Sequence, residues 1–249
     1  MKRRISVTIV AALLASGLTL SGCSRGEGGA VGPSGTEKAS PWVRPPMIDG
    51  VTRDGGVLIV RGAADPNARV VLRAPDVAAV AVNADAAGRF ELRLPPLHGD
   101  VRLTPEVQVG EDAAISPETL VVIQGGAGPV ALIAAGQPTV RLDGSSVLNA
   151  VDSDGSTLVA SGPAGQNPPV VTIGGAEVDV APAARDRWRA MIGRAGAAPI
   201  TVAGQSFDYP GDGGGSGFSI ARAGQGWRIV WPVAPVGHQS AWLPDQAGH

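Results

Sequence analysis

From residue 42 onward the chain consists of short apolar runs that recur at intervals of roughly eight to twelve residues. Glycine, proline, aspartate and asparagine separate the runs, and valine, isoleucine and leucine dominate within them. Alternation of apolar and polar positions is common, and no long stretch keeps the 3.6-residue period of an amphipathic helix. This pattern is typical of short antiparallel strands and predicts an all-β fold. The runs in the first half are 57–60, 70–72, 77–82, 90–94, 101–109 and 120–123.

The same pattern returns 100 residues later. Nine of the 21 positions from 51 to 71 carry the same residue as the position 100 further along the chain. Because one immunoglobulin-like sandwich takes about 100 residues, the repeat predicts two tandem immunoglobulin-like β-sandwiches, at 42–124 and 125–249. The matching residues of the first copy are Val51, Asp54, Gly55, Leu58, Gly62, Ala64, Asn67, Val70 and Val71.

The segment 187–192 has two interpretations. Trp188, Met191 and Ile192 lie at helical spacing. The repeat instead places this segment with the aromatic-containing strand around Phe90, with Trp188, Ala190 and Ile192 on one face. We favour the strand, because tertiary context overrides local spacing in so short a segment.

The amino terminus has the composition of a secretory signal. Lys2, Arg3 and Arg4 form a basic start, and residues 5–20 form an apolar stretch without any acidic residue. A membrane-spanning helix needs about 20 apolar residues, so this stretch is short for a span and fits a signal peptide at 1–22.

The end of the apolar stretch resembles the lipobox of bacterial lipoproteins. Leu20, Ser21 and Gly22 stand directly before Cys23. The resemblance implies cleavage before Cys23, a thioether-linked lipid on its sulfur and an acyl chain such as palmitate on the new amino terminus. Ser24, rather than aspartate, follows the cysteine, which in the enterobacterial sorting rule resembles an outer-membrane address. The alternative is an ordinary signal peptide with an unrelated cysteine.

Residues 23–41 are expected to form a lipidated flexible tether. Positions 24–41 contain five glycines, two prolines and a single valine, too little apolar surface for a core. A flexible segment of this length reaches on the order of 25 Å. Removal of residues 1–22 takes away three positive charges, so the side-chain net charge falls from −2 to −5. An acidic body gains little from anionic lipid, and the acyl chains would have to hold the membrane alone.

Two phrases of the first half resemble bacterial Ig-like domains. The segment 60–70 resembles the family phrase Gly-x-Ala-x-Pro-Gly-Ala-x-Val, and 85–90 resembles Asp-x-x-Gly-x-Phe/Trp. Asn67 stands where the family usually has glycine, and the second half matches less well around 166–169. Such modules are also similar to transthyretin-like accessory domains. The resemblance implies spacing, adhesion or ligand presentation, and it implies no catalysis.

Three of the five tryptophans lie close to the carboxyl terminus, at Trp227, Trp231 and Trp242. The alternation around the turn at 223–226 predicts a β-hairpin. One interpretation places the indoles in the core of the second sandwich. The other makes them a face for stacking on a sugar or a partner strand, with ligand-binding roles for all three.

The candidate chemistry is sparse. One cysteine excludes a disulfide framework, and three scattered histidines make a metal cluster unexpected. The glycine-rich segment 210–217 lacks the lysine of a phosphate loop. His98 stands near Asp100 and could in principle act as a general base, but we favour a place in an interstrand loop. Asp152 and Asp154 resemble half of a calcium loop, although Asp154-Gly155 is explained as a turn. We therefore expect no catalytic residues, no metal and no cofactor.

These observations predict a non-enzymatic, lipid-anchored binding or structural protein of the bacterial cell envelope, facing the periplasm or the surface. Its expected partners are the membrane, through the lipid, and an envelope protein or glycan. Nucleic acid is not expected as a partner, because the net charge of the chain is slightly negative rather than strongly basic. Two alternatives stay open. One is a carbohydrate- or peptidoglycan-binding lipoprotein that uses the three tryptophans. The other is an accessory subunit of a secretion, pilus or transport complex.

Overall fold

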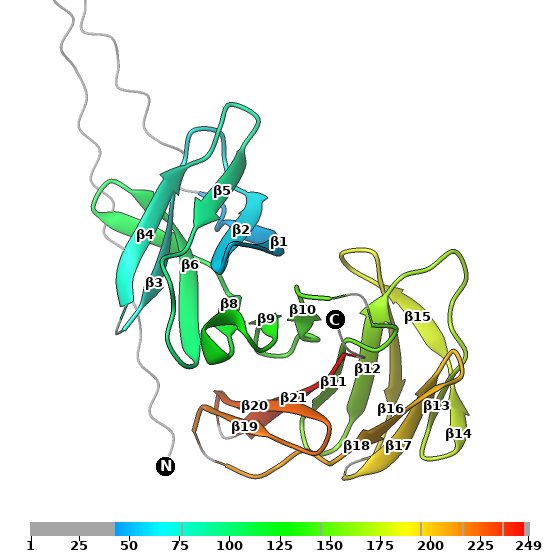
Figure 1. Ribbon diagram of the computed structural model, residues 1–249. Coiled ribbons are helices and arrows are strands. Elements are labelled where there is room, and N and C mark those ends of the chain that lie inside the picture. The colour runs from blue at the N-terminus through cyan, green and yellow to red at the C-terminus, as the bar shows by residue number, and fades with distance from the viewer. Residues whose placement is uncertain are drawn as a thin grey trace, which may run out of the picture. The chain divides into compact units, whose positions relative to one another are not determined.

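Antiparallel strands make up nearly all of the regular structure in the computed structural model, which describes residues 43–75, 77–144, 146–194, 196–215, 217–235 and 237–246. The described residues belong to one compact unit and form four sheets (Figure 1). One 3-10 turn at Gln124–Gly126 is the single helical element among them. The all-β expectation is confirmed.

The first half of the unit contains two facing sheets around one core. The smaller sheet has the order β1-β2-β5, and the larger has the order β10-β9-β8-β6-β3-β4 with β7 added on β6. Valine, leucine and isoleucine from both sheets fill the space between them, together with Phe90. The strands are β1 (Met47–Asp54), β2 (Val57–Ala63), β3 (Arg69–Ala74), β4 (Val77–Asn83), β5 (Arg89–Arg93), β6 (Val101–Val109), β7 (Asp112–Ile115), β8 (Thr119–Val122), β9 (Val130–Ile133) and β10 (Val140–Arg141).

The second half also has two facing sheets, ordered β15-β16-β12-β11-β21-β20-β19 and β14-β13-β17-β18. Leu158, Ile173, Trp188 and Trp242 are among the residues buried between them, and this set is called here the second core. The strands are β11 (Ala150–Ser153), β12 (Leu158–Pro163), β13 (Val171–Ile173), β14 (Ala176–Val178), β15 (Val180–Ala183), β16 (Arg187–Ile192), β17 (Ala198–Val202), β18 (Gln205–Tyr209), β19 (Ser219–Arg222), β20 (Gly226–Val233) and β21 (Gly237–Pro244).

The strand pairing repeats between the halves, as the internal repeat predicts. β1 pairs with β2 and β2 with β5, just as β11 pairs with β12 and β12 with β16. In the facing sheets, β3 pairs with β4 and β6, and β13 pairs with β14 and β17. Each half thus has two facing antiparallel sheets with the same pairing order, as in a β-sandwich. Residues 187–192 form strand β16, so the strand interpretation of this segment is confirmed.

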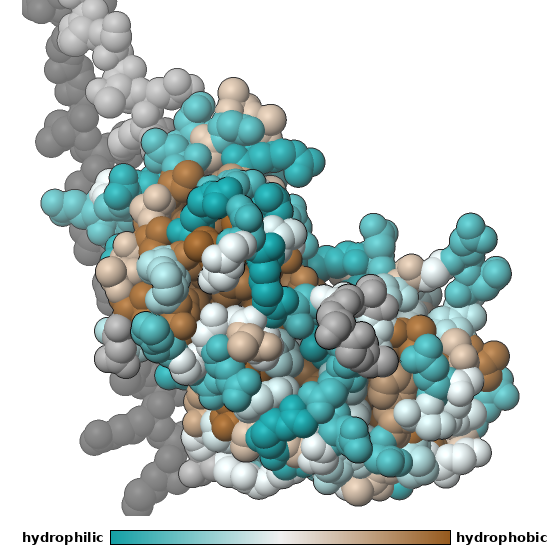
Figure 2. Space-filling view, viewed as in Figure 1, coloured by the Kyte–Doolittle hydropathy of each residue, from teal (hydrophilic) through white to brown (hydrophobic). Residues whose placement is uncertain are grey.

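One segment departs from the repeat. In the first half, β4 runs as a single strand at the edge of its sheet, and its only strand partner among the described residues is β3. The corresponding stretch of the second half is divided: β14 pairs with β13, whereas β15 crosses to the other sheet and pairs with β16. β4 consists of valine, alanine and one asparagine, and Figure 2 shows apolar residues gathered over the region of β3 and β4.

The chain passes from the first half to the second later than the sequence suggests. The expected boundary at 124/125 falls between β8 and β9, which are neighbours in one sheet. All four residues of β9 are buried: Val130 and Leu132 pack into the first core, whereas Ala131 and Ile133 face the second half. The first half therefore extends through β10, and the second begins at β11.

A glycine and an aromatic residue pair across the strands at the same place in each half. Gly62 lies opposite Phe90, and Gly162 lies opposite Trp188. A Cβ atom on Gly162 would stand 2.8 Å from the indole nitrogen of Trp188 and would also meet the carbonyl oxygen of Val147. The ring thus occupies the space that any other side chain would need.

We expect Gly162→Ala to lower the free energy of unfolding by about 1–3 kcal/mol, because the added methyl group overpacks the second core. Gly193→Ala is the matched control, since no atom lies within 4 Å of its added Cβ. Urea denaturation of both variants measures the difference. Equal stability of the two variants would show that the Trp188 ring does not fix this position.

Candidate functional site

The residues of the predicted lipobox lie outside the described part of the chain. This applies to Leu20, Ser21, Gly22 and Cys23, since the description begins at Val43. No helix in the described residues is both long enough and apolar enough to span a membrane. Lipidation of Cys23 stays a prediction.

The three carboxyl-terminal tryptophans do not share one exposed face. Trp242 is only 1% exposed in the second core, where its indole nitrogen donates to the Ala223 carbonyl at 2.9 Å. Trp231 is 6% exposed and lies on the opposite face of the same sheet. Trp242 pairs across the strands with Arg228 and so shares its face of the sheet. Trp227 and Trp231 alternate with Arg228 along β20, so their side chains point to the other face. Trp227 is half-buried beneath the Arg222 guanidinium, 5.2 Å from its ring centre. Of the two interpretations of these tryptophans, burial describes Trp231 and Trp242, and the alternation leaves no single face on which all three could stack against a ligand.

Trp231 belongs to a third apolar cluster, called here the junction core. From the first half it contains Val121, Ile123, Ala131 and Ile133; from the second it contains Ala150, Ile229, Trp231, Ala241 and Leu243. Strands β8 and β9 supply the first group except Ile123, which directly follows β8, and β11, β20 and β21 supply all of the second. The carboxyl-terminal hairpin therefore packs the two halves against each other. Burial of this apolar surface is the main source of their association.

Polar contacts surround the junction core. Arg141 donates to the Pro244 carbonyl at 2.5 Å and pairs with Asp143 at 3.2 Å. On another side, Arg185 of the second half donates to both carboxylate oxygens of Glu118 at 2.8 Å. Gln239 accepts from the Gly136 amide and donates to the Gln137 carbonyl, both at 3.0 Å. These directional contacts fix the orientation of the halves, because each requires a particular geometry.

A buried carboxyl group lies within this polar shell. Asp152 on β11 is 3% exposed and accepts hydrogen bonds from the Thr139 amide at 2.9 Å and the Thr139 hydroxyl at 2.6 Å. Burial raises the pKa of Asp152 from 3.8 to about 7, although the Thr139 hydrogen bonds and the charge of Arg187 oppose the shift. Asp152 thus holds the β9–β10 loop of the first half against the second.

The two acidic residues of the half calcium loop have different structural roles. Asp154 accepts hydrogen bonds from the Ser156 amide and hydroxyl and from the Thr157 amide, all at 2.8 Å. These bonds lower its pKa and close the turn between β11 and β12. Among the described residues, no group of three or more acidic, histidine or cysteine side chains converges as a metal site.

The other candidate motifs are also placed. His98 lies in the β5–β6 loop, where it lines a groove with Leu97 and Phe218. The described part of the glycine-rich segment 210–217 is held to β20 by the Arg228 guanidinium, which donates to the Gly211 carbonyl at 2.6 Å.

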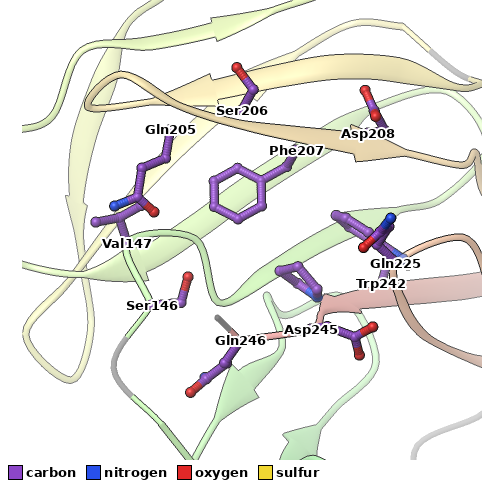
Figure 3. Close-up of a pocket in the computed structure, with 11 residues that line it drawn as sticks. Ser146, Val147, Gln205, Ser206, Phe207, Asp208, Gln225, Trp242, Asp245 and Gln246 are labelled. Carbon is purple, nitrogen blue, oxygen red and sulfur yellow. The ribbon is translucent and has the colours of Figure 1, made fainter. Parts of the chain in front are cut away.

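A cleft opens beside β18 in the second half (Figure 3). Its volume is about 650 Å³. The Phe207 ring is directed into it, whereas the side chains of Ser206 and Asp208 point away, as alternation along a strand requires. The walls bring together segments distant in the sequence: Ser146, Val147, Gln205, Gln225, Trp242 and Gln246. Sequence reasoning did not single out Phe207. Its one signal was an aromatic residue between the polar neighbours Ser206 and Asp208.

Comparison with known proteins gives no relative: no protein-family model matches the chain, and no curated protein matches it.

Replacement of the junction indole tests the role of the third cluster. We expect Trp231→Ala to lower the free energy of unfolding by about 3–5 kcal/mol, the usual cost of deleting a buried aromatic side chain. Proteolysis in the segment between β10 and β11 should accelerate, because the halves lose their shared core. Trp227→Ala, at the half-buried edge of the same strand, should cost much less. Similar losses in the two variants would contradict the junction role.

The pKa of Asp152 predicts how stability depends on pH. The unfolded chain releases this proton near pH 3.8, whereas the native protein holds it until about pH 7. Between these values the native state binds more protons, so the free energy of unfolding should fall as pH rises from 4 to 7. Asp152→Asn, which mimics the neutral acid, should flatten this slope.

Asp154→Asn is the control for that experiment. The pKa of Asp154 is lowered, so its stabilising contribution is present above pH 3.8 and is lost in acid. Denaturant titrations at several pH values should therefore show a slope between pH 4 and 7 that Asp154→Asn retains and Asp152→Asn loses. An unchanged slope in Asp152→Asn would refute the assignment.

Proposed function

We propose that this chain is a lipid-anchored protein of the bacterial cell envelope that acts by binding a partner rather than by catalysis. The observation that carries the proposal is the order of its first segments: a basic start, an apolar stretch, Leu-Ser-Gly-Cys and a glycine-rich tether. Each segment serves the next, because export brings Cys23 to the lipid-transferring enzymes and the tether then frees the folded body from the bilayer.

The anchor would be sufficient by itself. Each buried CH₂ group contributes about 0.8 kcal/mol, and one acyl chain gives only marginal binding, whereas two or more give stable attachment. The mature chain has a side-chain net charge of −5, so electrostatic attraction to anionic lipid adds nothing. Attachment of the protein to the membrane therefore depends on the acyl chains at Cys23.

The folded body supports a presenting role. The junction core and its polar shell join two sandwiches into one unit, so a surface on either half is held in a fixed position relative to the other. A rigid binding surface loses less conformational entropy when it meets its partner. We propose that the tether supplies reach and the joined sandwiches supply this preorganised surface.

A second candidate, glycan binding, is favoured by a specific observation in the second half. The cleft beside β18 combines an aromatic ring, Phe207, with amide side chains at Gln205 and Gln225. This site differs from the tryptophan face considered from the sequence, of which only Trp242 lines the cleft.

Acylation of Cys23 is the test of the proposed function. We expect cells fed an alkyne-tagged fatty acid to label the wild-type chain, and mass spectrometry to find Cys23 as the modified amino-terminal residue. Cys23→Ser should lose the label and keep residues 1–22 attached, because lipid transfer to the cysteine precedes cleavage. Ser21→Ala is the matched control: it keeps a small residue in the lipobox, so both acylation at Cys23 and removal of residues 1–22 should be retained. A free Cys23 thiol in the wild-type chain would contradict the proposal.

A further inference from the structure

The cleft beside β18 has a rigid aromatic platform. Phe207 packs partly against the second core, and its cross-strand partner Ile200 is fully buried, so the ring is held in place while one side stays accessible. Trp242 forms part of the opposite wall, fixed by its hydrogen bond to Ala223 and by an edge-to-face contact with Tyr209, ring centres 5.9 Å apart. Flat rings of this kind bind apolar faces without a large entropy cost.

Hydrogen-bonding groups surround the ring. The side chains of Gln205, Gln225 and Ser146 line the cleft and make no hydrogen bond to any described residue. An amide offers two donors and an acceptor, and a hydroxyl offers both functions. Such groups match a ligand whose own hydroxyls both donate and accept. They are also spread around Phe207 rather than on one side of it (Figure 3).

The charge of the cleft restricts the ligand further. Its acidic residues are Asp245 and Asp208, the second with its side chain directed away, and no lysine, arginine or histidine is among the described residues that line it. Asp245 is paired with Arg222 through both oxygens, at 2.7 and 2.6 Å. A phosphate, sulfate or uronate would find no unpaired basic side chain among the described lining residues to offset the loss of its hydration. The cleft therefore fits a neutral or amine-bearing ligand.

A second cavity lies beside the first. Val147 lines both, and the second, of about 730 Å³, is bounded by Pro168, Pro169, Val170 and the edge of Trp188. The turn between β17 and β18 contributes to both as well, through Gly204 and Gln205. A ligand longer than one ring could thus pass from Phe207 across Val147 into the neighbouring space.

We infer that this cleft is a binding site for a linear oligosaccharide that is neutral or carries amines, with Phe207 as its stacking platform and Gln205 and Gln225 as its hydrogen-bonding groups. The apolar face of a pyranose ring would lie on Phe207, while its equatorial hydroxyls would reach the two amides. The inference rests on the proposed function only in that the chain acts by binding. The site itself does not depend on the lipid.

The test uses the full mature chain in detergent micelles and four soluble probes: tetra-N-acetylchitotetraose, cellotetraose, the chitosan tetramer and, as the anionic member, tetragalacturonate. Isothermal titration calorimetry should detect binding of at least one of the first three, with dissociation constants of about 10 μM to 1 mM. Tetragalacturonate should bind at least tenfold more weakly. The disaccharide of the best probe should bind at least about fivefold more weakly than the tetramer.

Matched variants locate the site. Phe207→Leu keeps an apolar side chain of similar size, and Gln225→Ala removes an exposed amide, so both should fold; each should weaken binding at least tenfold. Met191→Ala is the control, because Met191 is 60% exposed and does not line either cavity. Thermal unfolding of each variant checks that the fold is retained.

Several results would overturn the inference: no binding of any neutral or amine-bearing probe up to about 10 mM, binding that Phe207→Leu leaves unchanged, or preference for tetragalacturonate. Phe207-dependent capture of an extended peptide in place of every sugar would also overturn it. These failures are distinguishable from failure of the proposed function, since acylation of Cys23 is measured separately and does not involve the cleft.

Discussion

The architecture depends on apolar burial between two sheets that belong to different repeats. β8 and β9 present alternate side chains to two cores, so each strand stabilises the first sandwich with one face and the junction with the other. The carboxyl-terminal hairpin completes the arrangement by extending the sheet of the second half through β11 and placing Trp231 and Ile229 against β8 and β9. Without this shared burial the ion pair of Arg185 with Glu118 would be two side chains near a surface, and pairs of that kind contribute little.

Joining the halves also determines the chemistry of the polar groups between them. Asp152 would be an ordinary surface carboxylate on an isolated second sandwich, and its high pKa arises because the β9–β10 loop covers it. Arg187 is a further buried charge on β16, and burial lowers its pKa. Two ionisable groups of opposite type are thus placed where neither is well solvated. Burial of such groups is weak evidence of added stability, because the cost of desolvation offsets their mutual attraction.

Alternation and turn residues were enough to predict the strands, because each strand has one buried face and its pattern is local. The repeat predicted that the second half folds like the first, although it left the order of strand pairing open. Strand β16 shows why the repeat outweighed helical spacing, because Trp188 and Ala190 point into the second core. The junction core could not be predicted from the local sequence pattern, because a run such as 130–133 is equally apolar whether its side chains fill one core or two. The cleft was also beyond it, because Ser146, Phe207 and Gln225 converge only after the sheets have formed. Burial of Trp231 and Trp242 in different cores could not be predicted either, because it depends on which sheet packs against each face of their own sheet.

The two glycine–aromatic pairs carry a consequence for how such a repeat can diverge. At each site a backbone carbonyl, from Met47 or Val147, and a ring, from Phe90 or Trp188, together fill the volume in front of the glycine. The ring identity has already changed between the copies while the glycine has not. A side chain at either glycine would meet this backbone carbonyl as well as the ring, so a smaller residue across the strand would relieve only one of the two contacts. In duplicated sandwiches of this type the glycine is therefore the residue expected to persist, while the ring that faces it is free to change.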